Sequence, residues 1–347
     1  MSEKRTTNVV GIPVSVLRWG LVLFAAASIL GFLAAFLFSE DWAQDLASLQ
    51  HFKPLWFVPA LGLLLLDWLG GGLRIYALIG PHEKGMSYFK CIQVAVVATA
   101  LGYLTPSSTG SAPGIIYGLT RQGLSFGRAA ALNAVQFLAN VVFLSLAGLV
   151  AWALGAGDAI RDVTLPVADL SAADLFKWSA WLFGAGVTVI VLLALAPGVA
   201  RGVIRRLMGS EHPRIDRVLH QFDELHRGIV VYWQSGKLLF LLAVLSGVIH
   251  FGARFVLGYV VLKGFVTQAP FLTVVLLHIM LQYLLFVMPT PSGAGVGEVL
   301  AAAVMAPFLT PGLVIPYTVV WRIFLNYGTV AVGGTQIMSW LAAEGGR

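Results

Sequence analysis

The feature that most constrains this chain is a series of apolar runs, each about as long as a bilayer is thick. Runs near the roughly 20 residues that a helix needs to cross hydrocarbon fall at about 19–38, 55–79, 128–154, 176–196, 238–262 and 313–340. The chain is 58% hydrophobic and only 11% charged over 347 residues, and a soluble domain of that size would need far more polar surface. The sequence therefore predicts an all-α, polytopic membrane protein with six transmembrane helices.

Two further apolar regions, about 88–120 and 271–309, are too long for one crossing. Their centres carry the related stretches "TPSSTG", which begins at Thr105, and "TPSGAG", which begins at Thr290, 185 residues later. Proline and closely spaced glycines end helices and form turns. Each region is therefore predicted to be two shorter helices joined by a turn.

The charges of the connecting segments predict how these elements sit in the membrane. Segments 39–54 and 156–175 are mainly acidic, whereas 197–237 holds seven Lys/Arg against four acids. Because Lys and Arg mark cytoplasmic loops, the first two are predicted outside and the third in the cytoplasm. Basic residues also flank both ends of 88–120, which predicts a re-entrant hairpin that enters and leaves on the cytoplasmic face.

Continuing this count places the second hairpin on the opposite face and both termini in the cytoplasm. The apolar run from Trp19 to Phe38 is longer than a signal-peptide core and lacks a convincing small-x-small cleavage site. It is predicted to be a retained first helix. The predicted location is the bacterial plasma (inner) membrane.

The similarity between the two halves extends beyond the turns. Gly72-Leu73-Arg74 and Gly252-Ala253-Arg254 precede them, and Gln136-x-x-x-Asn140 and Arg322-x-x-x-Asn326 follow them. One membrane domain over 1–347 is predicted, with repeat 1 at about 55–154, a connecting helix and basic cytoplasmic linker at 176–237, and repeat 2 at about 238–340. Because the connecting helix adds one crossing, the repeats have inverted topology.

Irregular backbone at membrane depth must be satisfied by protein or by a polar cavity. In transporters with inverted repeats, broken helices meet near the midplane and present free amides to the substrate. The turns are therefore predicted to bind substrate through Thr105, Ser107, Ser108, Gly110, Ser111, Thr290, Ser292, Gly293 and Gly295.

Ionisable residues inside spans are costly and indicate function by default. Glu298 and Arg322 are predicted to pair or to share a ligand, with a purely structural ion pair as the alternative. Further predicted site residues are Arg254, Asn326, Asp67 and Arg74. For Arg74 the alternative is a side chain that reaches the nearby cytoplasmic interface.

The sequence contains no HExxH, P-loop or DxD motif. It predicts no enzyme activity, no cofactor, no metal site and no nucleic-acid partner. In the basic linker, apolar residues between 215 and 229 follow helical spacing with charges between them. This pattern predicts an amphipathic helix that meets anionic lipid headgroups, and ordinary positive-inside topology with packing on the bundle is the alternative.

Three stretches carry a resemblance to a known family: "TPSSTGSAPGIIYGLTRQGLSFGRAAA" (105–131), "MPTPSGAGVGEVLAAAVM" (288–305) and "WRIFLNY" (321–327). From about 18 to 340 the chain resembles the flippase-like transmembrane region of the lysylphosphatidylglycerol synthase family, as a free-standing member without the synthase domain. The resemblance implies handling of lipids with modified headgroups or of polyprenyl-linked carriers. The first half departs from the family pattern, with the uncharged residues Ala112, Gln136, Phe137 and Asn140 where such proteins usually carry charges.

Together these features predict a flippase or transporter of an amphiphile with a polar, anionic or modified headgroup, such as a phospholipid or polyprenyl-linked lipid. The site would open alternately to the two faces at the hairpin turns. Two alternatives stay open. One is a non-transporting partner or regulator of an envelope lipid-modifying enzyme or glycosyltransferase, and the other is a secondary transporter of a small solute.

Overall fold

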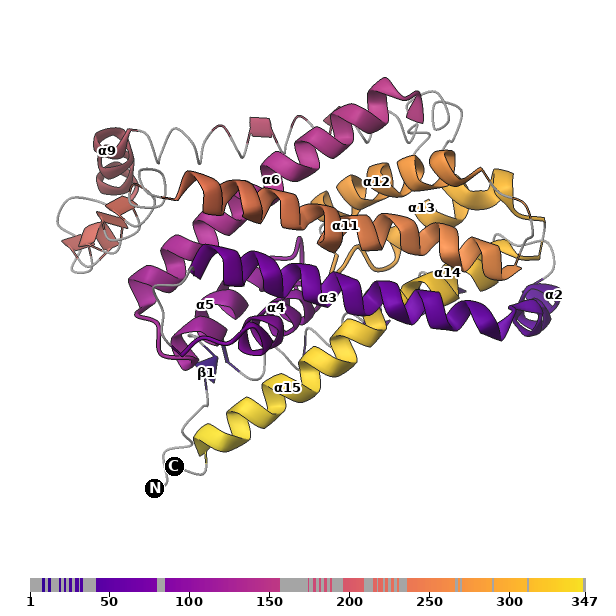
Figure 1. Ribbon diagram of the computed structural model, residues 1–347, viewed down its shortest axis with the longest axis horizontal. Helices are drawn as coiled ribbons and strands as arrows, with labels where there is room; N and C mark the ends of the chain where they lie inside the picture. Colours follow the sequence, from indigo (N-terminus) through magenta and orange to yellow (C-terminus); the bar gives the residue numbers. More distant parts are fainter. Residues whose placement is uncertain are drawn as a thin grey trace.

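The computed structural model describes residues 42–79, 85–156, 196–208, 236–265, 270–288, 290–310 and 312–345, with single residues and short stretches elsewhere. Almost every described element is helical (Figure 1). The exceptions are two strands, β1 (Asn8–Val9) and β2 (Ile12–Pro13), which pair antiparallel. The predicted all-α class is confirmed, and the small strand pair was not predicted.

Three described helices are long and apolar enough to cross a membrane. They are Pro54–Ile79, which contains α3 (Phe57–Ile79), α6 (Phe126–Ala153) and α11 (Lys237–Phe265). They confirm that the stretches predicted as spans at 55–79, 128–154 and 238–262 are long apolar helices. The spans predicted at 19–38 and 176–196 lie largely outside the described residues.

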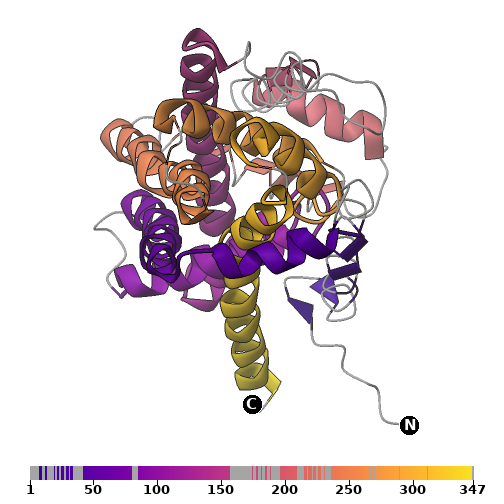
Figure 2. The ribbon, with the colours of Figure 1, turned by 90° about the vertical axis from the view of Figure 1, so that its right-hand side faces the viewer.

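The last predicted span is helical from Val314 to Gly345 but is not one regular α-helix. It consists of α14 (Val314–Arg322), a π-helical segment η5 (Ile323–Tyr327) and α15 (Gly328–Gly345). A π-helical turn widens the helix locally and occurs often at functional sites. It changes the direction in which the side chains after Arg322 point. The end of α15 extends beyond the other helices (Figures 1 and 2).

Each interrupted apolar region forms two helices joined by a turn. α4 (Tyr88–Tyr103) and α5 (Ser111–Arg121) form the first pair, and α12 (Phe271–Val287) and α13 (Val296–Met305) form the second. Glycines allow close packing in the first pair: a Cβ on Gly114 would lie 2.9 Å from the Cα of Ala98. Figure 1 shows the two pairs toward opposite ends of α3 and α11.

Short helices surround this arrangement. α2 (Trp42–Ala47), η1 (Ser48–His51) and η2 (Pro54–Trp56) precede α3, and η4 (Ala306–Phe308) follows α13. Within the basic linker, α9 (Pro197–Met208) lies at one extremity of the molecule in Figure 1.

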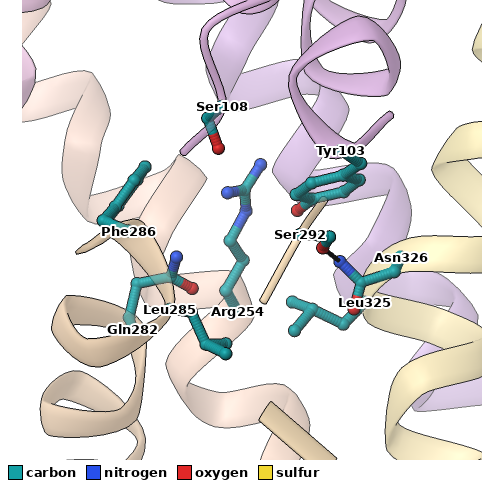
Figure 3. Close-up of a pocket in the computed structure, with 9 residues that line it drawn as sticks. All are labelled: Tyr103, Ser108, Arg254, Gln282, Leu285, Phe286, Ser292, Leu325 and Asn326. Atoms are coloured by element: carbon teal, nitrogen blue, oxygen red, sulfur yellow. Dashed lines mark hydrogen bonds between the residues drawn. The ribbon is translucent and has the colours of Figure 1, made fainter. Parts of the chain in front are cut away.

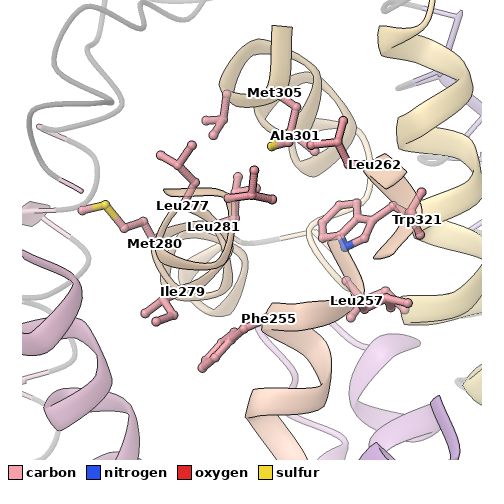
Figure 4. Packing of buried hydrophobic residues seen from close by; sticks show 14 of the residues in the cluster. Phe255, Leu257, Leu262, Leu277, Ile279, Met280, Leu281, Ala301, Met305 and Trp321 are labelled. Atoms are coloured by element: carbon pink, nitrogen blue, oxygen red, sulfur yellow. The ribbon is translucent and has the colours of Figure 1, made fainter. Parts of the chain in front are cut away.

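The buried apolar side chains form two main clusters and a small one between them. One joins the start of α3 and the end of α11 to α12, α13 and α14 (Figure 4). Another joins the end of α3 and the start of α11 to α4, α5, α6 and the end of α15. The small cluster contains Tyr103, Leu104, Ala294 and Val330, from the two turns and α15. Each helix pair thus has its own core, and the turns meet between the cores.

α3 and α11 cross at a glycine. A Cβ on Gly70 would lie 2.5 Å from the backbone nitrogen of His250 and 2.8 Å from its Cα. No rotamer change relieves a clash with backbone, so any side chain here must push the helices apart. Gly70 and His250 occupy the same place in the two predicted repeats, since each lies four residues before an arginine, Arg74 or Arg254.

We expect Gly70→Ala to lower the free energy of unfolding by about 1–3 kcal/mol, the usual cost of overpacking. Gly62→Ala is the matched control, because Gly62 lies on the same helix with nothing within 4 Å of the added Cβ. It should be neutral or stabilising by up to ~1 kcal/mol through helix propensity. Unfolding of both variants in detergent measures the difference, and equal effects would contradict the close crossing.

Candidate functional site

The two turns meet at the centre of the molecule. We call residues 105–110 the first tip and residues 290–295 the second tip. Pro106 and Pro291 pair as an isolated antiparallel β-bridge. Ser107 Oγ also donates a hydrogen bond of 3.2 Å to the carbonyl oxygen of Met288, just before the second tip. The paired prolines are equivalent positions of the repeated motif.

The tips have the same backbone conformation over part of their length. Ser107 and Ser108 have φ angles of 49° and 56°, and the equivalent Ser292 and Gly293 have 55° and 66°. Non-glycine residues rarely adopt positive φ, and they do so at a cost of about 1–3 kcal/mol when the surroundings enforce it. Two successive residues in this region let each tip reverse direction within a few residues.

The tips differ in exposure. Pro106, Ser107 and Thr109 are exposed in the first tip, whereas the equivalent residues in the second tip are buried. Inside the first tip, Thr105 accepts a 2.7 Å hydrogen bond from the Gly110 N–H and donates one of 2.9 Å to the Leu101 carbonyl. The first tip is therefore closed by its own side chains and accessible from outside.

The second tip is held by Arg322. Its Nη1 donates to the carbonyl oxygen of Ser292 at 3.1 Å, and its Nη2 donates to the carbonyl oxygen of Gly293 at 3.3 Å. Nη1 also donates to Asn326 Oδ1 at 2.9 Å, and the Asn326 amide donates to Ser292 Oγ. Arg322 thus binds two backbone carbonyls, and Asn326 the Ser292 hydroxyl, of a turn that the sequence analysis predicted to bind substrate. The π-helical segment contains Asn326.

Glu298 completes this arrangement, as the predicted partner of Arg322. Its Oε1 lies 3.2 Å from Arg322 Nε, and its Oε2 accepts from Arg322 Nη2 at 3.3 Å and from the Gly295 N–H at 2.7 Å. The Gly295 bond is the acidic half of a capping box at the start of α13. Glu298 and Arg322 are 0% and 1% exposed. The predicted ion pair is present, and both of its residues also bind backbone atoms of the second tip.

A second buried ion pair joins α3 to α11. Arg254 donates from Nε to Asp67 Oδ1 at 2.8 Å and from Nη2 to Asp67 Oδ2 at 3.2 Å. His250 Nδ1 lies 2.7 Å from the same Oδ1 and 2.9 Å from the Asp67 carbonyl oxygen. Two acceptors therefore face Nδ1, which must carry a hydrogen. The predicted Asp67 and Arg254 do meet.

A pocket lies beside the tips (Figure 3). Its open volume is about 310 Å³ with the mouth included. The Arg254 side chain extends into it, with Ser108 at its end and Tyr103 beside it (Figure 3). The lining contains both apolar and polar side chains, and the nine lining residues are Tyr103, Ser108, Arg254, Gln282, Leu285, Phe286, Ser292, Leu325 and Asn326.

Of the predicted residues, Ser108, Ser292, Arg254 and Asn326 thus line one pocket. Three more predicted residues do not line the pocket but hold residues that do. Asp67 binds Arg254, and Arg322, paired with Glu298, binds the Ser292 carbonyl oxygen and Asn326. The Thr290 hydroxyl is buried without a hydrogen-bond partner among the described residues. Ser111 begins α5 and packs against Gly102. Arg74 is buried away from the pocket lining, between α6 and α11.

Sequence reasoning missed several lining residues. Gln282 is one of the few polar residues of helix α12 and follows His278 by one turn, which is a signal that could have found it. Tyr103 directly precedes the first tip. Leu285, Phe286 and Leu325 carry no signal beyond their apolar character. Among the described residues, no group of three or more His, Cys, Asp or Glu could hold a metal ion.

Comparison with known proteins gives one family. The profile described as "Lysylphosphatidylglycerol synthase TM region" matches residues 18–333, nearly the whole chain, and no synthase domain is detected. None of the curated proteins matches the chain significantly. The family match and the apolar helices together identify an integral multi-pass membrane protein.

Proposed function

The chain belongs to the lysylphosphatidylglycerol synthase transmembrane-region family, and we propose that it moves an amphiphilic lipid across the bilayer. The polar head of that lipid would enter the pocket beside the tips while its tail stays among the helices. The observation that carries this proposal is the composition of the pocket lining, which combines a buried arginine and a hydroxyl from each tip with leucine and phenylalanine. An amphiphile is complementary to both kinds of side chain.

The pocket favours an anionic head. Ser108 supplies a hydroxyl at a partly exposed position, and Arg254 brings a planar guanidinium, a group that suits the oxygens of phosphate. Because Arg254 is already balanced by Asp67, a bound anion would share its donors rather than replace the carboxylate. A phospholipid or polyprenyl-linked phosphate fits this chemistry.

Movement across the bilayer requires the site to open to each face in turn, and we propose an inverted repeat as the basis. Equivalent residues face each other at Pro106 and Pro291, as expected on a two-fold axis. Gly148 of α6 packs on Tyr283 of α12, and Gly333 of α15, 185 residues later, packs on Ala100 of α4. In each predicted repeat, the helix that follows the helix pair thus packs on the helix pair of the other repeat.

In this scheme each helix pair is a re-entrant hairpin, and the two hairpins enter from opposite faces. The exposed first tip and the buried second tip would represent one of two states. In the other state the exposures would be reversed. Both termini would lie in the cytoplasm, and the membrane would be the bacterial inner membrane.

The basic linker would rest on that cytoplasmic surface. α9 carries Arg201, Arg205 and Arg206 together with exposed Val199, Val203 and Leu207. Cationic and apolar side chains on one short helix favour contact with anionic headgroups, at about 1 kcal/mol for each basic residue.

Blocking the pocket tests the proposal. We expect proteoliposomes containing the wild type to translocate fluorescent phosphatidylglycerol, measured by quenching from outside. Ser108→Trp should slow this at least roughly tenfold, equivalent to ~1.4 kcal/mol of barrier, because the indole fills the pocket. Ser339→Trp, on the exposed part of α15, is the control and should leave the rate unchanged. Equal rates for all three proteins, or none in the wild type, would refute the proposal.

A further inference from the structure

Arg74 is a buried cation that the pocket does not use. It lies on α3 and is 1% exposed. Its Nε donates to Ser246 Oγ of α11 at 3.3 Å, and its Nη1 donates to Asn140 Oδ1 of α6. Its Nη2 has no hydrogen-bond partner among the described residues. All its protein partners are neutral, so its charge is not balanced locally.

Asp67 cannot supply the missing charge. Its two carboxylate oxygens already accept from Arg254 and face His250. It also lies seven residues before Arg74, about 10 Å along the helix at ~1.5 Å per residue. An arginine does not lose its proton in proteins, and an unpaired buried charge is costly. A further anion near Arg74 would remove that cost.

The second half shows what the first half lacks. There a guanidinium also binds the helix asparagine, as Arg322 binds Asn326, and Glu298 balances it. The position equivalent to Glu298, at the offset of 186 that also relates Asn140 to Asn326, is Ala112. No carboxylate of the described chain lies within ion-pair distance of Arg74. In the second half the protein itself supplies the anion that balances the arginine. In the first half the anion that balances Arg74 must therefore come from outside the described chain.

The surroundings of Arg74 can accept a ligand. Asn140 is only partly buried, and Gln136, one turn earlier on the same face of α6, has a side-chain oxygen without a partner among the described residues. Phe137 beside them is 43% exposed. The Phe251 ring is 5.3 Å from the Arg74 guanidinium and 5.5 Å from that of Arg254, so it contacts both cations. The Arg74 group thus borders the outer face of α6.

We propose that Arg74, with Asn140 and Gln136, forms a second anion site that binds one phosphate group and is separate from the pocket lined by Arg254. Arg74 Nη2 donates to a phosphate oxygen, and Gln136 donates its amide after rotation of its side chain. Two sources share this chemistry: the phosphodiester of an anionic lipid that approaches along α6, and free inorganic phosphate. The site does not require that the protein translocates lipid.

The test compares thermal stability of the full chain in three conditions. These are phosphatidylcholine nanodiscs, the same nanodiscs with phosphatidylglycerol added, and phosphatidylcholine nanodiscs with inorganic phosphate against chloride at equal ionic strength. The variants are Arg74→Gln, Arg74→Lys, which retains the charge, and Lys90→Gln, a control that removes an exposed charge.

We expect an anionic probe to raise the Tm of the wild type, Arg74→Lys and Lys90→Gln by at least about 3 °C, because binding to the folded state stabilises it. Arg74→Gln should show no such rise, and without the probe it should be as stable as the wild type or more so, since an uncompensated charge is gone. A rise with phosphatidylglycerol alone identifies a lipid phosphodiester, and a rise with free phosphate identifies the soluble anion.

A structural role alone predicts a different pattern. Arg74→Gln would then lose the same stability in all three conditions, and this result would overturn the proposal. So would a wild type that responds to neither probe, or an identical response in every variant. A wild type that gains stability through Arg74 but moves no lipid keeps the anion site and removes the transport function.

Discussion

Replacing Arg322 with methionine is expected to lower the free energy of unfolding by roughly 3–5 kcal/mol, the cost of removing one partner from a buried ion pair. The substitution leaves the Glu298 carboxylate, 0% exposed, without its cation. It also removes the donors to the carbonyl oxygens of Ser292 and Gly293. Denaturant unfolding in detergent measures the loss.

A double-mutant cycle separates the ion pair from packing. Glu298→Gln keeps an acceptor for the Gly295 N–H but removes the charge, so adding it to Arg322→Met should recover part of the loss. Arg206→Met, at an exposed position on α9, should change stability by no more than about 0.5 kcal/mol. A loss below about 1 kcal/mol for Arg322→Met would mean that the pair does not hold the second tip.

The same variants bear on transport. If the second tip must be held in place for the site to change sides, Arg322→Met and Glu298→Gln should both translocate lipid more slowly than the wild type. The comparison is made in proteoliposomes with equal amounts of folded protein. Unchanged translocation in both variants would remove these two residues from the transport proposal.

The turns could be predicted because their sequence signal is local. A proline followed within a few residues by serine and glycine favours a turn even in an apolar run, so both tips follow from the sequence. Apolar runs of bilayer length likewise predict the three long helices. The Glu298 and Arg322 pair was also predictable, because two opposite charges in apolar surroundings need each other. These features depend on residue type and on spacing along one segment.

The partners of the tips depend on contacts across the whole chain and carry no such signal. The sequence analysis predicted that the second tip binds substrate, yet Arg322 already binds two of its backbone carbonyls. That contact needs the π-helical turn that follows Arg322 and the absence of a side chain at Gly297, where a Cβ would clash with the guanidinium. Likewise, the pocket joins Tyr103 to Gln282, which are far apart in sequence.

Asp67→Asn is the second substitution with a large expected effect, again a loss of about 3–5 kcal/mol. It removes the carboxylate that balances Arg254 and leaves Arg254 and Arg74, both buried, on the two adjacent helices α3 and α11 without an acid between them. The neutral amide also offers one acceptor where the carboxylate binds Arg254 through two oxygens. Unfolding in detergent measures the effect.

The chain contains a matched control for burial. Arg201 and Asp223 form an ion pair of the same residue types and the same 2.8 Å separation, but their side chains are 45% and 35% exposed. Asp223→Asn should therefore cost at most about 1 kcal/mol, as surface ion pairs do. Adding Arg254→Gln to Asp67→Asn should restore part of the lost stability, because the buried charge that Asp67 balanced is then gone as well. Equal losses for Asp67→Asn and Asp223→Asn would mean that water reaches Arg254 through the pocket and solvates its charge. Burial in a low-dielectric interior would then no longer explain the attraction of an anionic headgroup to Arg254.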